Sequence, residues 1–343
     1  MSTPCVTVSI PSYNHAAYLP QTLECLLGQT FQDFEVLIAD DGSTDNSLEI
    51  IEFYARRHAR IRVLTHPGYG HRGIAATSNL AAEQARGRYV AWLDSDDLWY
   101  PDTLARRVEF MENRPDMGLM CSFFDIIDEH GLVKKKRSGH DLKDDCGNRL
   151  AFLHRMIMGC DIGAPSVMIR RECLESLGLF EDLVYCDWEM WTRVAARYPI
   201  GFYDDTLVMY RRHGRNFSSH LMIADDLSHR VAVMQSLLDK SVTVKGLLVH
   251  PRIQAVLHLQ LCCFEFCLNR RVAAARSLVN ALMADRALLA DGGKYFYHWL
   301  SCNPPVKEPR KDFHHWILKC LQQAYAPAGL SRQKVSLAEP ALA

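Results

Sequence analysis

Short apolar runs alternate with helical patterns in the first half of the chain, and this alternation restricts the fold more than any other feature. Segments with apolar residues at helical spacing, such as Ala16–Gln29, lie between the runs. This order is typical of βαβ units around a mostly parallel sheet, so we predict an α/β fold. The expected strands are Val6–Ile10, Phe34–Ala39, Ile61–Thr65 and Tyr89–Leu93.

Strand-like and helical segments continue to about residue 220, and only helical patterns follow. The later strands and the helices between them would complete a mixed central sheet. We therefore predict one domain over residues 1–220 and an α-helical C-terminal region over residues 221–343. The expected later elements are strands Leu119–Ile127, Ser166–Arg170 and Ile200–Arg211, helices Arg149–Met158 and Trp188–Tyr198, and C-terminal helices Ala224–Leu238, Ile253–Leu268, Val272–Leu289 and Phe313–Ala324.

Composition excludes several classes of protein. A net charge of -1, with 48% hydrophobic and 23% charged residues, indicates neither a disordered chain nor a basic nucleic-acid-binding surface. The absence of a leader-like start and of a long apolar stretch predicts a cytoplasmic protein. The 12 cysteines form no Cys-x-x-Cys pair and are expected to be free thiols. Cys262, Cys263 and Cys267 have helical spacing, which favours helix packing over metal binding.

The run Asp94–Asp97 follows an expected strand and is the first candidate for chemistry. Ligands of open α/β sheets gather at the carboxyl ends of strands, and Asp94 and Asp96 can point the same way there. Carboxylates would hold Mg²⁺ or Mn²⁺, which could stabilise the charge that develops on a diphosphate leaving group. The alternative is a solvated acidic turn, and the run alone does not decide between the two.

A second acidic turn, Asp40–Asp45, also follows an expected strand. One of its carboxylates could accept the N3 hydrogen of a uracil ring. Taken alone, a strand-to-helix turn with an Asp cap is the better interpretation. Because both acidic turns follow strands of one expected sheet, a shared cleft becomes the simpler hypothesis.

Asp187 is the third candidate, because displacement at a sugar carbon with inversion needs a carboxylate to take the proton of the acceptor hydroxyl. The alternative role is a helix N-cap. The helix dipole would then lower the pKa of Asp187, which would make it a weaker base. Glu189 is the nearby rival for the role of base.

Taken in order and spacing, these motifs resemble the inverting family 2 glycosyltransferases of GT-A fold, which have a Rossmann-like nucleotide-sugar-binding domain. The resemblance covers Val6 to Ser218. The chain lacks the Gln-x-x-Arg-Trp motif of processive synthases, which favours a single-transfer enzyme. The matching segments are Val8–Asn14, Asp40–Asp45, Gly73–Asn79, Asp94–Asp97, Asp187–Glu189 and Tyr210–His213.

The resemblance implies a role for individual residues. Asp94 would contact the ribose or the sugar, Asp96 would ligate the metal, and Asp187 would be the catalytic base, which outweighs the objection from the helix dipole. Arg211 and His213 would close over the diphosphate, with His213 also a metal ligand. The residues that would hold the nucleoside are Pro11, Tyr13 and Asp40 or Asp41.

The chain departs from the family pattern at two positions. Ser78 stands where many members have an arginine before Asn79, so Arg72 is expected to supply the compensating charge. Cys186 replaces the acidic residue that often precedes the base, which puts the acceptor side in doubt.

The resulting hypothesis is transfer of a sugar from a nucleotide-sugar donor, with a UDP-sugar favoured, to a saccharide, a glycolipid or another hydroxyl acceptor. Such a reaction would belong to the synthesis of a cell-surface polysaccharide or glycoconjugate. The alternatives are a nucleotidyltransferase, which would need a Gly-rich loop where the chain has Pro11–Asn14, and a non-catalytic nucleotide-sugar-binding protein.

Two basic segments raise the question of an anionic surface. The run Lys134–Arg137 is interpreted as a solvated hairpin edge rather than an acceptor site. The amphipathic stretch Phe313–Lys319 is a candidate for peripheral membrane contact, although packing within the chain is the favoured interpretation.

Overall fold

The computed structural model describes residues 3–139, 142, 143, 146, 148–160, 162–216, 223–243 and 251–285. Contacts divide the chain into two compact units. The first unit comprises Met1–Leu221 with Asp239–Leu247, and the second comprises Met222–Leu238 with Leu248–Ala343.

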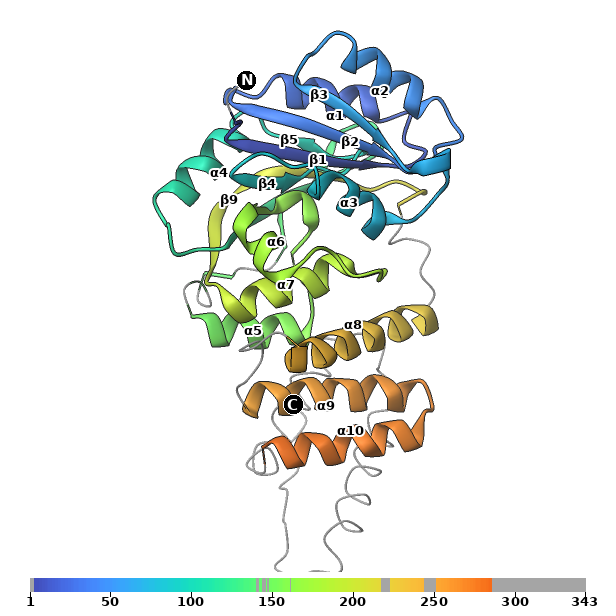
Figure 1. Cartoon of the computed structure of the whole chain (residues 1–343), viewed down its shortest axis with the longest axis vertical. Helices are drawn as coiled ribbons and strands as arrows, with labels where there is room; N and C mark the ends of the chain where they lie inside the picture. The colour runs from blue at the N-terminus through green and yellow to red at the C-terminus, as the bar shows by residue number, and fades with distance from the viewer. Residues whose placement is uncertain are drawn as a thin grey trace, which may run out of the picture. The chain divides into compact units, whose positions relative to one another are not determined.

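Four parallel strands form the first half of the sheet, in the order β3-β2-β1-β4, as the βαβ pattern predicts (Figure 1). Ser12 pairs with Asp40, and Asp40 with Thr65, so three strands end at about the same level. The strands are β1 (Val6–Ser12), β2 (Phe34–Asp40), β3 (Ile61–Thr65) and β4 (Tyr89–Trp92).

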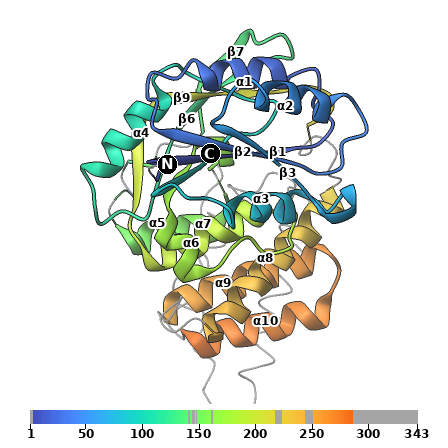
Figure 2. The ribbon, with the colours of Figure 1, turned by 45° about the horizontal axis from the view of Figure 1, so that its top comes forward.

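Alternate residues of β2 bury two separate faces of this half of the sheet. Val36 and Ile38 join the larger core, which includes side chains of α1 and α2, whereas Leu37 and Ala39 pack with Ala81 of α3. Figure 2 shows these helices on opposite faces of the sheet. The period of two along a strand therefore determines which helices cover which face. The helices are α1 (Leu19–Leu27), α2 (Ser47–Ala55) and α3 (Ile74–Ala82).

The second half of the sheet is mixed, as expected from the strand-like segments. β8 (Met168–Arg170) is antiparallel to β4 and to β6, whereas β6 and β9 are parallel. β5 pairs with β9 at the edge. The remaining elements are β5 (Leu98–Trp99), β6 (Leu119–Ile127), β7 (Val133–Ser138), β9 (Ile200–Arg211), α4 (Thr103–Glu112), α5 (Arg149–Met158), α6 (Arg171–Leu177), α7 (Cys186–Arg197) and the short helices η1 (Pro67–Tyr69) and η2 (Ala164–Ser166).

The basic run lies on β7, which pairs antiparallel with β6. Residues 133–137 of this strand are exposed, as a solvated hairpin edge requires. Lys134 Nζ lies 2.7 Å from Asp128 Oδ2, and Arg137 pairs with Asp204.

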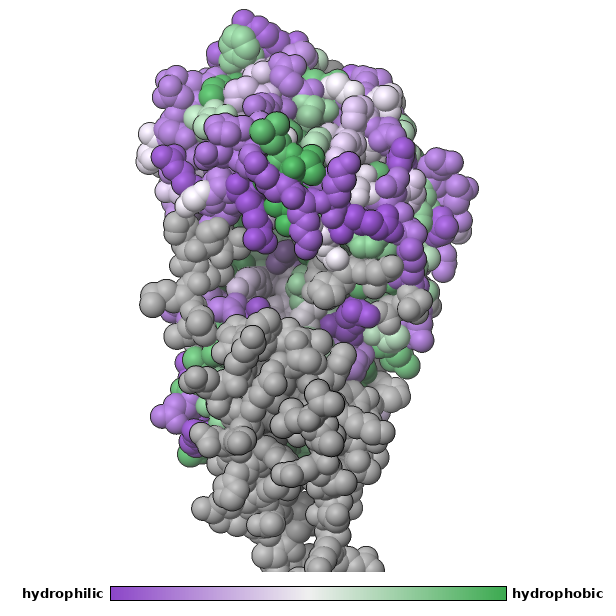
Figure 3. Space-filling view, turned by 180° about the vertical axis from the view of Figure 1, so that it is seen from behind, coloured by the Kyte–Doolittle hydropathy of each residue, from purple (hydrophilic) through white to green (hydrophobic). Residues whose placement is uncertain are grey.

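On the face shown in Figure 3, most surface side chains of the described residues are hydrophilic, with small separate apolar patches.

The second unit contains α8 (Ile223–Thr243) as far as Leu238, together with α9 (Pro251–Cys267) and α10 (Arg271–Ala284). Cys262 and Cys263 are buried in α9, which agrees with helix packing. Among the described residues, no helix is long and apolar enough to span a membrane. The expected helix Phe313–Ala324, with its amphipathic stretch, lies outside the described residues.

The sequence predicts a helix that ends at about Arg86, with Gly87 as its C-terminal cap, but the structure gives this glycine a different role. Helix α3 ends at Ala82, and Gly87 lies beside β1, where its backbone N–H donates to Thr7 Oγ1 over 2.8 Å. A Cβ at Gly87 would lie 2.4 Å from the backbone nitrogen of Thr7 and 2.7 Å from the carbonyl carbon of Val6. The glycine is therefore required by close backbone approach.

We expect Gly87→Ala to lower the free energy of unfolding by about 1–3 kcal/mol, because the methyl group overpacks rigid backbone. Gly159→Ala is the matched control, since a Cβ there meets nothing within 4 Å. Urea denaturation of the two variants measures the difference. Equal midpoints would contradict the packing argument.

Candidate active site

The turn after β2 holds the loop after β1 in place. Asn14 has a left-handed backbone (φ 55°), and its side-chain oxygen accepts a hydrogen bond from the backbone nitrogen of Thr44 over 2.7 Å. In return, Ser43 Oγ accepts from the backbone nitrogen of Asn14, and Ser47 Oγ from that of His15, both over 3.0 Å. The second acidic motif therefore builds a scaffold that presents His15.

The Asp40 carboxylate is fully buried and has partners in the turn after β2 and in η1, which follows β3. Ser43 donates to it through its backbone nitrogen (2.9 Å) and its hydroxyl (2.7 Å), and the Tyr69 hydroxyl donates over 2.9 Å. Such bonds are typical of a strand-to-helix turn. These hydrogen bonds agree with the structural role that the sequence analysis gave as the alternative for this motif, a strand-to-helix turn.

The Asp41 carboxylate binds the glycine-rich loop that follows β3. The backbone nitrogens of Arg72 and Gly73 donate to its two oxygens over 2.6 and 2.9 Å. His71 Nδ1 lies 2.9 Å from Asp41 as well. Asp41 therefore fixes the position of Arg72, whose own side chain is exposed.

Of the other residues expected to hold the nucleoside, Tyr13 lies in this same loop cluster. Tyr13 is 39% exposed, and its ring lies 4.2 Å from that of His71, centroid to centroid, at a tilt of 35°. Pro11 is buried within β1. The structure thus brings Tyr13, His71 and Arg72 together at the surface above two buried carboxylates.

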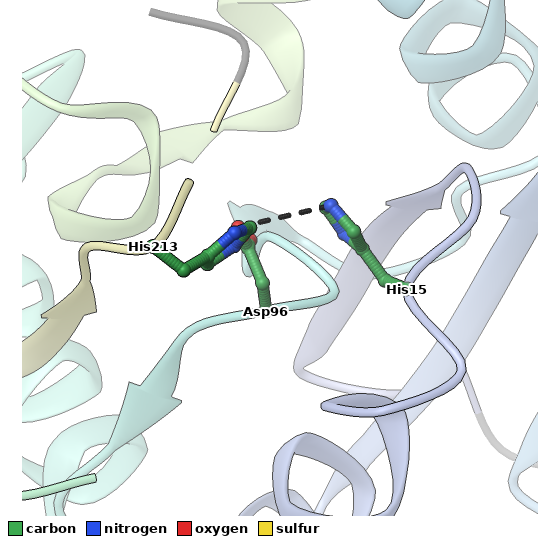
Figure 4. Close-up of side chains that lie close together, drawn as sticks. All are labelled: His15, Asp96 and His213. Carbon is green, nitrogen blue, oxygen red and sulfur yellow. Dashed lines mark hydrogen bonds and ion pairs between the residues drawn. The ribbon is translucent and has the colours of Figure 1, made fainter. Parts of the chain in front are cut away.

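Three loops bring His15, Asp96 and His213 together, from the ends of β1, β4 and β9 (Figure 4). His213 Nε2 lies 2.9 Å from Asp96 Oδ2, and His15 Nε2 lies 3.9 Å from the same oxygen. Asn216 Nδ2 donates to it over 3.2 Å. One ligand atom from each of the three residues lies within 4.8 Å of the others, so the cluster could hold a cation.

His15 and Asn216 were not singled out from the sequence. The lone histidine after Asn14 carried no metal-ligand spacing, because its partners come from remote segments of the chain. Burial lowers the pKa of His15, which favours the neutral imidazole that a metal requires.

Asp94 and Asp187 form a second acidic group beside this cluster. Burial, and then the charges of Asp96 and Asp187, raise the pKa of Asp94 to about 8. Burial also raises the pKa of Asp187 to about 6, although the backbone N–H of Trp188 donates to its carboxylate over 2.7 Å and acts in the opposite direction. The expectation that the helix dipole lowers this pKa was therefore wrong, because desolvation outweighs it.

Glu189 does not fit the role of base. Its side chain is fully buried, and its carboxylate pairs with Arg193 Nε over 2.8 Å. Arg193 also donates to the carbonyls of Leu177 and Leu179. Glu189 therefore pairs with the arginine that joins α7 to the end of α6 and the segment after it, whereas Asp187, at the start of α7, is partly exposed.

Asn79 has a comparable structural role. Its side-chain amide donates to the carbonyl oxygen of Phe180 over 2.8 Å and accepts from the Phe180 backbone nitrogen over 2.9 Å. The pair of bonds connects α3 with the segment that leads to α7. Ser78, beside it, is buried.

Arg211 was expected to contact a diphosphate, but the structure gives its guanidinium another role. The side chain is fully buried, and Nε donates to the carbonyl oxygen of Asp96 over 2.7 Å. The other nitrogens donate to Gln21 Oε1 and to the carbonyl oxygens of Asp128 and Glu129. A guanidinium so engaged positions the acidic loop instead of facing a ligand.

Asp97 is the last residue of the acidic motif and is hydrogen-bonded to Arg211 as well. Its Oδ1 accepts from the backbone nitrogen of Arg211 over 2.7 Å, while Oδ2 has no hydrogen-bond partner among the described residues. Burial, followed by the charges of Asp96 and Asp94, raises the pKa of Asp97 well above its usual range.

We expect Arg211→Gln to lower the free energy of unfolding by about 1–3 kcal/mol, because buried carbonyl oxygens lose their donor. Arg212→Gln, at an exposed neighbour, should change it by less than about 0.5 kcal/mol. Thermal unfolding without ligand measures both. If Arg211→Gln kept full stability and lost only diphosphate affinity, the structural role would be wrong.

The glycosyl transferase family 2 model matches residues 7–178 of this chain. An uncharacterised glycosyltransferase of Methanocaldococcus jannaschii is 30% identical over 220 residues, which cover 63% of this chain and 73% of the relative. Nucleotidyl transfer and a non-catalytic role lose their support, since both the family and this relative are glycosyltransferases.

Two solved structures resemble the chain at the level of the fold. One is S. aureus TarS 1-349 in complex with UDP-GlcNAc, with a TM-score of 0.60, 21% identity and 81% of each chain covered. The other is the mannosyltransferase PcManGT from Pyrobaculum calidifontis in complex with GDP-Man and Mn²⁺, with a TM-score of 0.55, 23% identity, and 95% and 88% of the two chains covered. Together with the mixed sheet and the acidic strand ends, these matches show that the chain belongs to glycosyl transferase family 2 and has the GT-A fold.

Proposed function

We propose that this glycosyltransferase transfers a sugar from a UDP-sugar to an acceptor hydroxyl, with inversion and with the help of a divalent cation. The observation that carries the proposal is the division of labour among neighbouring carboxylates. Asp96 faces two imidazoles, whereas the partly exposed Asp187 has a pKa raised to about 6. Burial, and then the charges of both, raise the pKa of Asp94, so the three side chains belong to one site.

The donor nucleoside would bind at the loops after β1, β2 and β3. The exposed ring of Tyr13 offers a stacking surface for the base, and a free lone pair of Asp40 or Asp41 could accept its imide hydrogen. Arg72, held by Asp41, would face the diphosphate. Since TarS binds UDP-GlcNAc and PcManGT binds GDP-Man, the choice of UDP is open to direct test.

Asp96 and His213 would hold Mn²⁺ or Mg²⁺. The donor set fits a cation, because an imidazole nitrogen and a carboxylate oxygen lie together in a largely buried position. When bound, the cation supplies positive charge that stabilises the departing diphosphate. Arg211 acts indirectly, by fixing the backbone of Asp96.

Asp187 would act as the general base. A carboxylate with a pKa near 6 is ionised at neutral pH, and it is a better proton acceptor than an ordinary aspartate. It takes the proton of the acceptor hydroxyl as the oxygen attacks the sugar carbon. The acceptor would be a saccharide, a glycolipid or another hydroxyl compound, in the synthesis of a cell-surface polysaccharide or glycoconjugate.

Calorimetric titration with UDP and with GDP, with and without Mn²⁺, tests this proposal together with donor-sugar turnover. We expect Mn²⁺ to strengthen UDP binding in the wild type, and Asp96→Ala to abolish that gain. Asp187→Asn should keep UDP binding and lose turnover by at least about a hundredfold. Normal turnover by Asp187→Asn would remove its role as base, and binding of GDP alone would remove UDP.

The pH dependence follows from the raised pKa of Asp187. Because the base works only when ionised, kcat/KM should fall as the pH drops below about 6 and reach a plateau above it. Steady-state rates between about pH 5 and pH 8 measure this step, which should be absent from the residual activity of Asp187→Asn. A kcat/KM that stayed level down to about pH 5 would contradict the assignment.

A further inference from the structure

His15 faces the cation-binding residues, but the proposal above does not make it a ligand of the cation. Its Nε2 lies 3.9 Å from Asp96 Oδ2, and its ring meets that of His213 edge-on with centroids 5.8 Å apart (Figure 4). We propose that His15 is a third protein ligand of the cation and that this second imidazole makes the site select Mn²⁺ over Mg²⁺. The inference rests on the proposed function and concerns the same site.

The other nitrogen of the His15 ring is already oriented. Nδ1 lies 2.7 Å from the hydroxyl of Ser95, which is buried and belongs to the acidic motif itself. Histidines that ligate metals usually have such a partner on the second nitrogen, which fixes the ring and its tautomer. The loop that carries Asp96 therefore also carries the group that turns Nε2 of His15 towards Asp96.

The backbone of His15 is held as firmly as its ring. The backbone nitrogen of His15 donates to Ser47 Oγ over 3.0 Å, and that of Ala16 donates to Asp45 Oδ2 over 3.1 Å. These bonds connect the loop with the start of α2, so the imidazole is presented from a scaffold instead of a free loop. A cation would thus meet a largely preorganised ligand.

The two imidazoles differ in how easily they can bind a cation. The backbone nitrogen of Arg215 donates to Nδ1 of His213, which places the proton of a neutral ring on Nε2, facing Asp96. A cation could bind that nitrogen only after the ring proton moved to Nδ1, and the hydrogen bond from Arg215 would then be lost. The Ser95 hydroxyl can donate or accept, so His15 can offer the lone pair of Nε2 without losing its partner.

The donor set has a consequence for the choice of metal. Mg²⁺ favours oxygen ligands in octahedral geometry and gives up its water reluctantly. Transition-metal ions accept imidazole nitrogen more readily, and Mn²⁺ is the one of these held by the neighbour PcManGT in its complex with GDP-Man. Each imidazole that replaces an oxygen ligand therefore favours Mn²⁺ over Mg²⁺.

Metal titrations in the presence of UDP provide the first test. We expect His15→Gln to weaken Mn²⁺ binding by at least about tenfold and to leave Mg²⁺ binding nearly unchanged, so the preference for Mn²⁺ falls. His130→Gln is the matched control, because its side chain is 76% exposed and lies on the loop before β7. An unchanged ratio of the Mn²⁺ and Mg²⁺ affinities in His15→Gln would overturn the inference.

Pulsed electron paramagnetic resonance of the bound Mn²⁺ provides the second test, because it detects directly coordinated nitrogen. We expect two coupled imidazole nitrogens in the wild type, and one each in His15→Gln and His213→Gln. If His15 merely positioned Asp96, the wild type and His15→Gln would show the same single nitrogen. That result would overturn the inference while leaving the proposed function intact.

Failure of the two proposals can be told apart. If the wild type binds UDP without any effect of Mn²⁺, the proposed metal dependence fails and the role of His15 fails with it. Should His15→Gln fold poorly, Ser95→Ala keeps the imidazole and removes only its orienting partner. The preference for Mn²⁺ should then still decrease, and an unchanged preference would contradict the inference.

Discussion

One buried guanidinium holds the acidic loop in the position on which the rest of the site depends. Arg211 donates to the backbone of Asp96 and, at the same time, to Gln21 of α1 and to the carbonyls of Asp128 and Glu129. It thereby joins the end of β9 to three segments that are far apart in the sequence. A fully buried arginine needs all of these acceptors, so the loop cannot move without leaving a costly unpaired charge.

The aspartates of the site differ because of their surroundings. Asp41 is occupied by the backbone nitrogens of the loop after β3 and acts as part of the scaffold. Asp96 faces the imidazoles. Burial raises the pKa of Asp187 by more than the hydrogen bond at the start of its helix lowers it. Glu189, only two residues further, is neutralised by Arg193. Partners and burial therefore decide which carboxylate can bind, position or accept a proton.

Much of the fold could be predicted because it depends on local periodicity. The expected strand Phe34–Ala39 agrees with β2 to within one residue, and β6 has the predicted bounds Leu119–Ile127. The predictions were wrong where the role of a residue depends on contact with distant backbone or on burial. Gly87 is required by close contact with β1, not by a helix end, and the pKa of Asp187 follows from desolvation that a motif does not reveal.

The sequence by itself determined the parallel half of the sheet, the family, and the strand ends at which acidic residues gather, since periodicity and motif order are local properties. Only the tertiary structure decided how those ends meet. His213 contacts Asp96, which lies 117 positions away in the sequence, and His15 contacts Ser95, which lies 80 positions away. Arg211, which was expected to contact a diphosphate, is buried and holds the backbone of Asp96. These roles depend on strand order and register, which bring remote side chains within hydrogen-bond distance.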